Sequence, residues 1–298
     1  MGTDHGVPMI DMQKVEGLED ELEKAYEEWG CFRMANHGVP VELLNEMKLV
    51  VASLFDLPLD IKMRAIQLGM GYIPRNLATS FYEGFAINDV SSPAEFYDLL
   101  EVSPHQREII YKYIKAIRDL AGHLGRKLME CSGLDGDLFD GWQCQLRMNK
   151  YNYSHESVGS KGSEEHTDPS FLTILQDDDD VNGLQVVDKV SGKFVPLDPV
   201  PNTLAVNVGD LGKVWSNGKY YNVNHRVLCL EPKTRYSIAL FVLGPTQNKL
   251  ETPPKFIDSE HPQIYIPIDH EEYRRVRTSM RTVQARNGGA LALFSAAT

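Results

Sequence analysis

From Trp142 onwards, short strand-like runs follow one another at close intervals, and this pattern leaves few folds open to the chain. Turn-forming pairs such as Asn182-Gly183, Ser191-Gly192 and Asn217-Gly218 separate several of the runs. Many short strands with tight turns are typical of a sandwich or jelly roll. We therefore expect a mixed α/β protein with a mainly β core of the jelly-roll type. The runs cover residues 145–153, 171–176, 184–188, 193–197, 203–208, 227–230 and 235–244.

The first 142 residues are also mixed α/β but weighted towards helix. Ser103, Pro104 and Gln106 mark a helix start, with a capping serine, a first-turn proline and the glutamine of a capping box. We expect this helix-rich part, residues 1–142, to pack on a jelly-roll core formed by residues 143–298 within one compact unit. The other expected elements are strands at 7–10 and 31–34, helices at 17–29 and from 41 to the proline at 58, a long loop at 69–90, a short charged helix near 271–277 and a final strand at 290–294.

The composition bears on the kind of partner the protein has. A formal net charge of −12 and a pI of about 5.2 argue against nucleic acid, because binding a phosphate backbone requires a basic surface. No apolar run is long enough to span a bilayer, and the first residues do not resemble a signal peptide. The cysteines form no CxxC pair and show no zinc-ligand spacing. We therefore expect a cytoplasmic protein with no membrane or nucleic-acid partner, and no feature indicates a homo-oligomer.

His166-Thr167-Asp168 places an imidazole and a carboxylate two residues apart. In an extended segment such residues point to the same side, where both can bind one metal ion. The pair alone is weak evidence, because His-x-Asp also arises by chance. His225 adds a second imidazole just before a strand-like run. Two histidines and one carboxylate form the facial triad of non-haem Fe(II) oxygenases, although this ligand set alone leaves zinc open.

Arg235 and Ser237 lie at the start of the most hydrophobic strand-like run, on the face opposite to Tyr236. An arginine buried without a partner is costly, so we expect a carboxylate beside Arg235. That carboxylate belongs either to a ligand or to an internal salt bridge. Guanidinium binds carboxylates through a bidentate fork, and a serine hydroxyl adds one more donor. Asn149 and Tyr151 alternate on another expected strand and offer an amide and a phenol to a keto acid.

Several further motifs are spread along the chain: Trp29-Gly30-Cys31-Phe32, Asn36-His37-Gly38-Val39, Arg147-Met148-Asn149-Lys150-Tyr151, Leu175-Gln176-Asp177-Asp178, Asn207-Val208-Gly209-Asp210, Trp215-Ser216-Asn217-Gly218 and His225-Arg226-Val227. Together with His166-Thr167-Asp168 and Arg235-Tyr236-Ser237, they show that the chain resembles plant 2-oxoglutarate-dependent dioxygenases over nearly its whole length. The resemblance implies a double-stranded β-helix flanked by helices.

The resemblance also implies a set of ligands. Fe(II) is expected on three residues, His166, Asp168 and His225. The cosubstrate 2-oxoglutarate is expected on four, Asn149, Tyr151, Arg235 and Ser237. O₂ is then the co-reactant and ascorbate the expected reductant.

Within this family, the strings Thr173-Ile174-Leu175-Gln176 and Arg235-Tyr236-Ser237-Ile238-Ala239 look most like those of the dioxygenases for auxin oxidation. That group converts indole-3-acetic acid to 2-oxoindole-3-acetic acid, with succinate and CO₂ as co-products, and the resemblance implies the same reaction here. Asn152-Tyr153-Ser154 replaces the proline that usually follows Asn149-x-Tyr151, a departure that bears on the substrate. The alternatives are a dioxygenase for a gibberellin or a flavonoid, and a non-catalytic cupin-like protein that binds a small acid.

Aromatic residues beside a single cation suggest where the substrate binds. Aromatic walls suit a flat ring and a guanidinium suits a carboxylate, so we expect a small aromatic carboxylic acid. Core packing is the competing explanation for each aromatic residue. The candidate residues are Tyr72, Arg75, Phe81, Tyr82 and Phe171. The acidic run at 177–180 lacks the spacing of a calcium-binding EF-hand, and we expect it to form a solvated turn.

Overall fold

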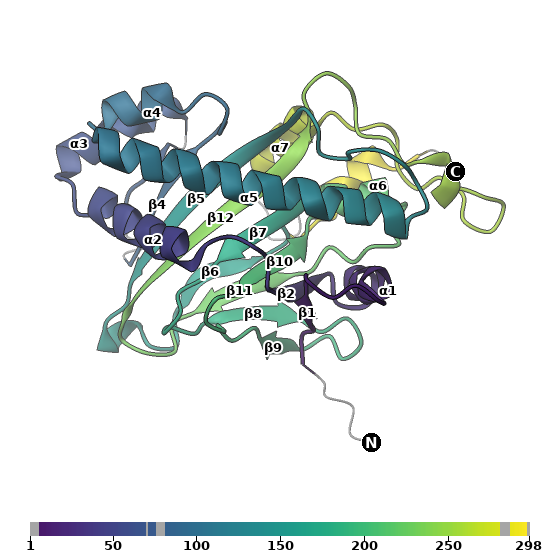
Figure 1. Ribbon diagram of the computed structural model, residues 1–298, viewed down its shortest axis with the longest axis horizontal. Helices are drawn as coiled ribbons and strands as arrows, with labels where there is room; N and C mark the ends of the chain where they lie inside the picture. The colour runs from purple at the N-terminus through teal and green to yellow at the C-terminus, as the bar shows by residue number, and fades with distance from the viewer. Residues whose placement is uncertain (1–5, 70, 76–80, 281–286, 297–298) are drawn as a thin grey trace.

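Two β-sheets form the centre of the molecule, and a long helix, α5 (Pro104–Cys131), crosses the outer face of the larger sheet (Figure 1). The computed structural model describes residues 6–69, 71–75, 81–280 and 287–296. The larger sheet has eight strands and the smaller has four. The expectation of a mixed α/β protein with a mainly β core is therefore confirmed.

The larger sheet is antiparallel except where its first two strands pair in parallel. Its order is β1 (Met9–Asp11), β2 (Cys31–Ala35), β10 (Leu204–Val208), β7 (Leu172–Gln176), β12 (Thr234–Pro245), β5 (Trp142–Asn152), β4 (Tyr82–Ile87) and β3 (Tyr72–Ile73). The smaller sheet has the order β6 (Lys161–His166), β11 (His225–Leu228), β8 (Leu184–Val187) and β9 (Phe194–Pro196). Four strands of the larger sheet come from the helix-rich N-terminal part, so both parts of the chain build one sheet.

Helix α5 (Pro104–Cys131) begins with the expected capping box. The Ser103 hydroxyl accepts a hydrogen bond from the backbone N–H of Gln106, whose side chain accepts one from the Ser103 N–H at 2.9 Å. The other helices are α1 (Leu18–Lys24) with the π-helical turn Ala25–Trp29, α2 (Val41–Phe55), α3 (Leu59–Arg64) with the 3₁₀ turn Ala65–Leu68, α4 (Ala94–Leu99), α6 (Asp210–Trp215) and α7 (His270–Ser279). Short 3₁₀ segments cover His155–Ser157, Pro254–Phe256 and Gly289–Phe294.

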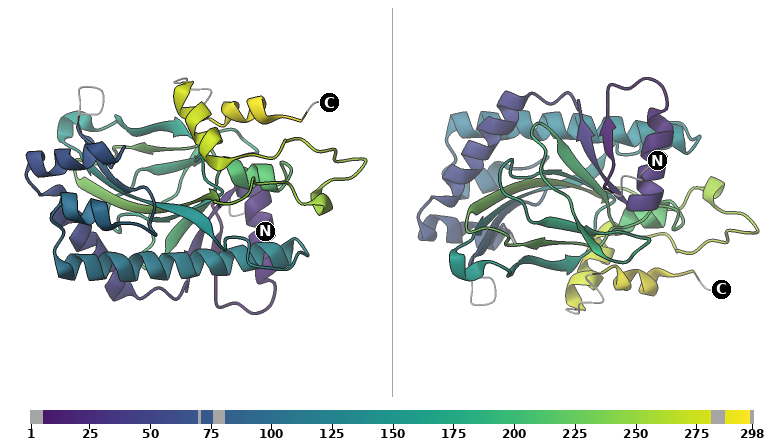
Figure 2. Two further views of the ribbon diagram at one scale, coloured as in Figure 1. Left: turned by 90° about the horizontal axis from the view of Figure 1, so that it is seen from above. Right: turned by 90° about the horizontal axis from the view of Figure 1, so that it is seen from below.

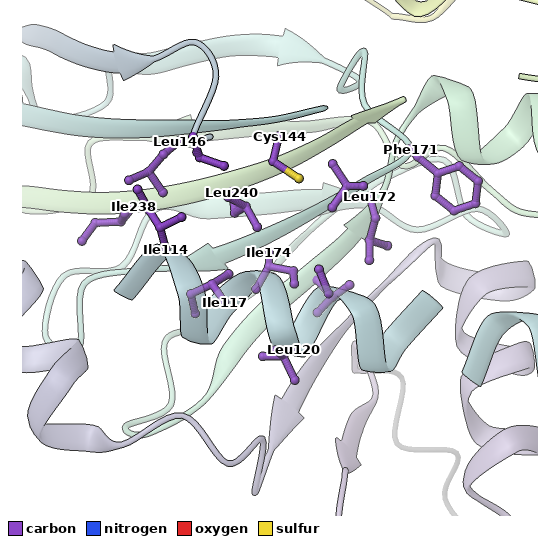
Figure 3. Close-up of a cluster of buried hydrophobic side chains, with 14 of the residues drawn as sticks. Ile114, Ile117, Leu120, Cys144, Leu146, Phe171, Leu172, Ile174, Ile238 and Leu240 are labelled. Atoms are coloured by element: carbon purple, nitrogen blue, oxygen red, sulfur yellow. The ribbon is translucent and has the colours of Figure 1, made fainter. Parts of the chain in front are cut away.

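The strands of the larger sheet alternate between an apolar outer face and a polar inner face. Figure 3 shows Ile114, Ile117 and Leu120 of α5 packed against outer-face residues such as Leu146 and Leu240. Since side chains alternate along a strand, the residues between these apolar positions point to the opposite face. The two views in Figure 2 place helix α7 on the side of the sheets away from α5. The inner face of the larger sheet therefore points towards the smaller sheet, on the same side as α7.

Two expected elements are wrong. Much of the supposed loop at 69–90 is strand, because β4 pairs with β5 and β3 pairs with β4, while residues 70 and 76–80 lie outside the described residues. Glu83, a buried charge near the start of β4, hides the alternation that would reveal this strand. The supposed strand at 290–294 is a 3₁₀ helix that begins after Gly288, which has a left-handed backbone.

The acidic run at 177–180 is not a solvated turn throughout. Asp177 is buried and receives hydrogen bonds from both terminal nitrogens of Arg33, at 2.6 and 3.3 Å. Asp178 is also buried and pairs with Lys48.

None of the helices in the described part of the chain combines the length and apolar character that crossing a membrane requires.

Candidate active site

A cavity of about 550 Å³ lies between the inner faces of the two sheets. Ligand sites usually fall in the range of roughly 300–1,000 Å³, so the space suits one or two small molecules. Strands β5, β7, β10 and β12 of the larger sheet line one wall, and β6, β8 and β11 of the smaller sheet line the other. Both the expected metal ligands and the expected cosubstrate ligands point into this one cavity.

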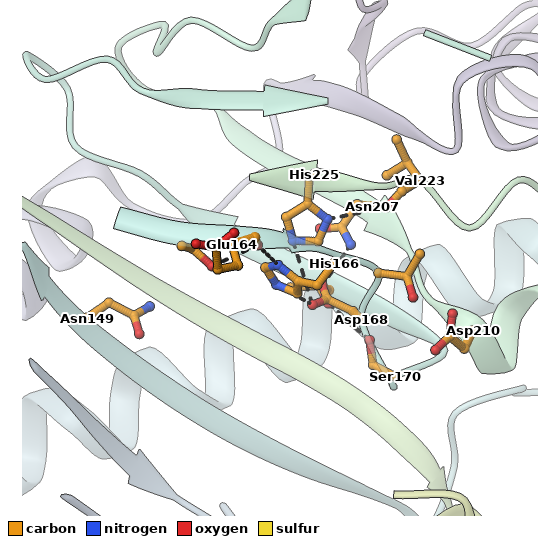
Figure 4. A network of polar contacts seen from close by, with 12 residues as sticks. Asn149, Glu164, His166, Asp168, Ser170, Asn207, Asp210, Val223 and His225 are labelled. Carbon is orange, nitrogen blue, oxygen red and sulfur yellow. Dashed lines mark hydrogen bonds and ion pairs between the residues drawn. The ribbon is translucent and has the colours of Figure 1, made fainter. Parts of the chain in front are cut away.

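His166, Asp168 and His225 come together at one point of the cavity wall (Figure 4). One potential ligand atom from each lies within 4.8 Å of the other two. Oδ1 of Asp168 is 3.7 Å from Nε2 of each histidine. Strand β6 carries His166 and its neighbour β11 carries His225, and the two residues face each other in the antiparallel register. The structure therefore brings together the three residues that the sequence predicts as a triad.

Hydrogen bonds on the far side of the triad orient its ligand atoms. Nδ1 of His166 donates to the carbonyl of Glu164 at 2.7 Å, and Nδ1 of His225 donates to that of Val223 at 3.3 Å. A carbonyl only accepts, so both protons sit on Nδ1 and both Nε2 lone pairs face the common point. Asp168 is held in the same way, because its Oδ2 accepts hydrogen bonds while Oδ1 remains for a ligand. The two donors to Oδ2 are Thr173 at 2.6 Å and Asn207 at 2.8 Å.

The charges of the triad suit a cation. Burial and the neighbouring imidazole of His225 lower the pKa of His166 to about 3, so this imidazole is neutral at pH 7. Burial alone would raise the pKa of Asp168, but the two imidazoles and two hydrogen bonds hold that pKa below its ordinary value. The site therefore offers the neutral imidazole of His166, the imidazole of His225 and one carboxylate, a ligand set for a divalent metal ion.

Arg235 lies at another part of the cavity with its guanidinium incompletely paired. The residue is only 1% exposed, and its Nε and Nη1 have no hydrogen-bond partner among the described residues. No carboxylate of the described chain forms an ion pair with it, which leaves the internal salt bridge without support there. Its guanidinium carbon lies 5.5 Å from the centre of the Tyr151 ring. A buried cation that lacks partners calls for an anionic ligand in the cavity.

The polar residues beside Arg235 form a hydrogen-bonded row. Asn149 donates through Nδ2 to Ser237 at 3.1 Å and accepts through Oδ1 from the Tyr82 hydroxyl at 2.9 Å. Burial raises the pKa of Tyr82, so its hydroxyl keeps its proton and remains a donor.

Gly162 on β6 permits the close approach of the smaller sheet to this region, because a Cβ there would lie 2.0 Å from the Tyr153 hydroxyl.

Arg147 is a cation in the cavity that the sequence reading did not single out. It lies on the same face of β5 as Asn149 and forms no ion pair with a carboxylate of the described chain. Burial and the nearby Arg147 charge lower the pKa of Arg274, which lies on α7. Glu271 offsets part of this effect on Arg274. Within the described part of the chain neither arginine forms an ion pair with a carboxylate, and two such neighbouring guanidinium groups favour an anion at this position.

Of the five residues expected to bind the substrate, only Tyr82 lines the cavity. Arg75 pairs with Glu83 at 3.0 Å, and the Tyr72 hydroxyl donates to the same carboxylate at 2.8 Å. Phe171 is buried elsewhere, packed edge-on against Trp142 and other aromatic rings. Phe81 packs against Tyr153, with ring centres 5.5 Å apart. Core packing and a local ion pair therefore account for four of the five. The residues that line the cavity in their place include Ile73, Arg147 and Phe241.

Two family models match the chain. The model of the 2OG-Fe(II) oxygenase superfamily matches residues 142–244, and that of the non-haem dioxygenase in morphine synthesis N-terminal region matches residues 7–112. Gibberellin 3-beta-dioxygenase 1 of Arabidopsis thaliana is 30% identical over 93% of this chain and 81% of its own length. The chain belongs to the 2OG-Fe(II) oxygenase superfamily, and it is a dioxygenase, an oxidoreductase.

The chain is more similar to the dioxygenases for auxin oxidation than to the gibberellin dioxygenase. The 2-oxoglutarate-dependent dioxygenase DAO of rice is 42% identical over 97% of this chain and 99% of its own length. The crystal structure of the rice dioxygenase for auxin oxidation covers 98% of this chain with a TM-score of 0.88. The dioxygenase for auxin oxidation 1 of Arabidopsis thaliana, in its binary complex with 2-oxoglutarate, is 48% identical over 86% of this chain with a TM-score of 0.82. These likenesses confirm the jelly-roll fold.

Proposed function

We propose that His166, Asp168 and His225 bind Fe(II), and that Arg235 binds the distal carboxylate of 2-oxoglutarate. One observation carries this proposal: a buried guanidinium with no carboxylate partner among the described residues shares a cavity with a preformed triad of metal ligands. The donor set fits Fe(II), because two imidazole nitrogens and one carboxylate oxygen leave three positions open for a chelating cosubstrate and O₂. When bound, Fe(II) couples the oxidative decarboxylation of 2-oxoglutarate by O₂ to oxidation of the substrate.

The residues of the chain position the reactants. Arg235 supplies the fork for the far carboxylate, and Ser237 adds a hydroxyl on the same face of β12. Asn149 and Tyr151 lie opposite Ser237 and Arg235 on β5 and bound the space for the keto acid. Thr173 and Asn207 hold the Asp168 carboxylate in a fixed rotamer. Because the cavity lies between two sheets, its walls shield part of the space around the reacting groups from solvent.

We propose indole-3-acetic acid as the substrate and 2-oxoindole-3-acetic acid as the product, with succinate and CO₂ as co-products and ascorbate as the reductant. The proposal is supported by the similarity to dioxygenases for auxin oxidation. It is also supported by the charges in the cavity, because Arg147 offers a second cation for a second acid. Arg147 pairs in register with Ala239, four positions along β12 from Arg235. At about 3.4 Å per residue, the two guanidinium groups can bind two acids without competition.

The cavity also offers apolar contacts for a flat ring. Ile73, Tyr82 and Phe241 line it together with the alanine at position 239. An indole ring carrying a carboxylate matches a wall with aromatic residues and with Arg147, which forms no ion pair with a carboxylate among the described residues. Flavonoids lack the carboxylate, and gibberellins lack the flat aromatic ring.

The test is an assay of succinate formation with Fe(II), ascorbate and each candidate substrate, combined with mass analysis of the product. We expect indole-3-acetic acid to stimulate succinate formation and to gain one oxygen atom, while indole without its acetic side chain is a much poorer substrate. Efficient turnover of a gibberellin or a flavonoid, with none of indole-3-acetic acid, would contradict the substrate and leave the iron chemistry standing. Absence of succinate with every candidate would favour a cupin-like binding protein.

A further inference from the structure

Thr167 lies between two of the proposed metal ligands, and its own side chain points away from the metal position. Both of its oxygen atoms accept hydrogen bonds from one guanidinium, that of Arg277 on helix α7. Nη1 of Arg277 donates to the Thr167 hydroxyl at 3.0 Å, and Nη2 donates to the Thr167 carbonyl. A fork that holds both the main chain and the side chain of one residue fixes its orientation as well as its place.

Asp210 completes this arrangement from a second element. It is the first residue of α6 and is fully buried, and its carboxylate forms an ion pair with Arg277. The same carboxylate accepts hydrogen bonds from Tyr273 at 2.5 Å and from Asn222 at 2.7 Å. Its backbone N–H donates to the carbonyl of Asp168 at 2.8 Å. One residue thus binds the metal-ligand segment directly and also through Arg277, and Figure 4 shows Asp210 beyond Asp168.

The C-terminal segment packs against the same group of atoms. A Cβ at Gly288 would lie 2.9 Å from the Asn222 amide and 3.1 Å from the Asp210 carboxylate. Gly288 also has a left-handed backbone, which favours glycine. The Asp210 carboxylate is therefore closely enclosed, whereas Arg277 also lines the cavity.

We propose that Arg277 and Asp210 are positioning residues that preset His166 and Asp168 for the metal ion. This inference rests on the proposed metal site and goes beyond it, because neither residue is a ligand. The three-residue segment 166–168 must hold an imidazole and a carboxylate at one spacing before the ion arrives. Groups that hold ligands in this way typically raise metal affinity by about 10- to 100-fold. Helix α7, remote in sequence from the ligands, thereby contributes to the affinity for the metal.

The test uses Mn(II) as the probe and measures its binding to the metal-free protein by calorimetry. The principal variant is Asp210→Asn with Arg277→Met, which removes both charges together and leaves no uncompensated buried charge. We expect Mn(II) to bind about 10- to 100-fold more weakly to this variant, while the unfolding temperature of the metal-free protein stays near that of the wild type. The single variant Arg277→Lys is expected to bind Mn(II) more tightly than the double variant but more weakly than the wild type, because an ammonium group lacks the fork. Arg275→Met, an exposed arginine on the same helix, is the matched control and is expected to bind Mn(II) as the wild type does.

Three outcomes are distinguishable. Wild-type affinity for Mn(II) in a folded double variant would overturn the inference and show that Arg277 only fastens α7. If the double variant does not fold, Thr167→Val decides, because it removes one acceptor of the fork at little cost in volume. A several-fold weaker affinity in this variant is expected, and no change would overturn the inference. Failure of the wild-type protein itself to bind Mn(II) would contradict the proposed metal site instead.

Discussion

His225 on β11 lies directly opposite His166 on β6, and the centres of their rings are 4.2 Å apart. The pairing of two strands, rather than a local motif, thus sets the distance between the two imidazoles. Because side chains alternate along a strand, a slip of one residue would turn one histidine out of the cavity. Asp168 joins them from the segment that follows β6, where Thr173 and Asn207 hold its carboxylate.

Removal of one ligand tests the triad. We expect Asp168→Ala to lose Fe(II) binding and turnover, because the two remaining imidazoles form an incomplete site and face the metal without its only carboxylate. Calorimetry with Mn(II) and the succinate assay measure the two effects. His261→Ala, which removes an exposed histidine, is the control and should behave as the wild type does. Near-normal turnover in Asp168→Ala would refute the triad.

Removal of the Arg235 guanidinium tests the cosubstrate site. Loss of one side of a buried charge pair costs about 3–5 kcal/mol, so Arg235→Ala should weaken 2-oxoglutarate binding by roughly two to four orders of magnitude. Metal binding should persist, because Arg235 is not a ligand. Titration of the metal-loaded protein with 2-oxoglutarate measures the effect, with the exposed Arg118→Ala as the control. An unchanged half-saturating concentration would mean that Arg235 pairs within the protein.

Replacement of Arg147 tests recognition of the substrate acid. Arg147→Met keeps the length of the side chain and removes the charge. A hydrogen bond to a charged group contributes about 1.5–3 kcal/mol, so we expect KM for indole-3-acetic acid to rise roughly 10- to 100-fold. The affinity for 2-oxoglutarate should be unchanged, since Arg235 remains. A neutral analogue with an alcohol in place of the acid provides the control, and an equal loss for that analogue would contradict a role in binding the carboxylate.

Glu83 connects the β3–β4 hairpin to helix α3, and its loss should destabilise the fold. The buried carboxylate pairs with Lys62 at 3.0 Å and with Arg75 at 3.0 Å. Glu83→Gln leaves the Lys62 ammonium uncompensated and should lower the free energy of unfolding at pH 7 by about 3 kcal/mol, as measured by urea denaturation. The exposed Glu95→Gln is the matched control and should have little effect.

The effect of Glu83→Gln should depend on pH. Burial alone would raise the pKa of Glu83, but Lys62, Tyr72 and Arg75 hold it below the ordinary value of 4.5. A lowered pKa in the folded state stabilises the protein fully above pH 4.5, and this contribution is lost as the pH falls through the lower folded value. The difference between wild type and variant should therefore be large at pH 7 and shrink below pH 4.5. A difference that stays constant with pH would contradict the ion pairing of Glu83.

Capping residues and the alternation of side chains were sufficient to predict those elements whose own sequence contains such a pattern. The capping residues Ser103 and Gln106 marked the start of α5, and alternation placed Asn149 and Tyr151 on the inner face of β5. Strand β6 was missed, because Lys161–His166 is almost entirely polar and lacks an apolar face. It pairs only with β11 among the described strands and lines the cavity, so its polar residues follow from its place in the fold.

Long-range pairing explains why four of the five expected substrate residues lie outside the cavity lining. Arg75 and Arg147 are both single arginines near aromatic residues in the sequence, and only the folded chain shows that Glu83 neutralises the first. Phe171 follows the metal ligands in sequence, yet the chain turns it into the aromatic core beside Trp142. The link between Arg277 and Thr167 joins segments that no local pattern connects.

The most direct test of the account is an anaerobic titration with Fe(II) and 2-oxoglutarate followed by visible absorption. Chelation of Fe(II) by the keto acid produces a charge-transfer band without turnover, so the band reports the metal and the cosubstrate together. We predict that the wild-type protein develops this band at one equivalent of Fe(II). Asp168→Ala should lack the band, and Arg235→Ala should show it only at much higher 2-oxoglutarate concentration. A wild-type protein that forms no such band, or an Asp168→Ala variant that forms it normally, would contradict the shared site for iron and 2-oxoglutarate.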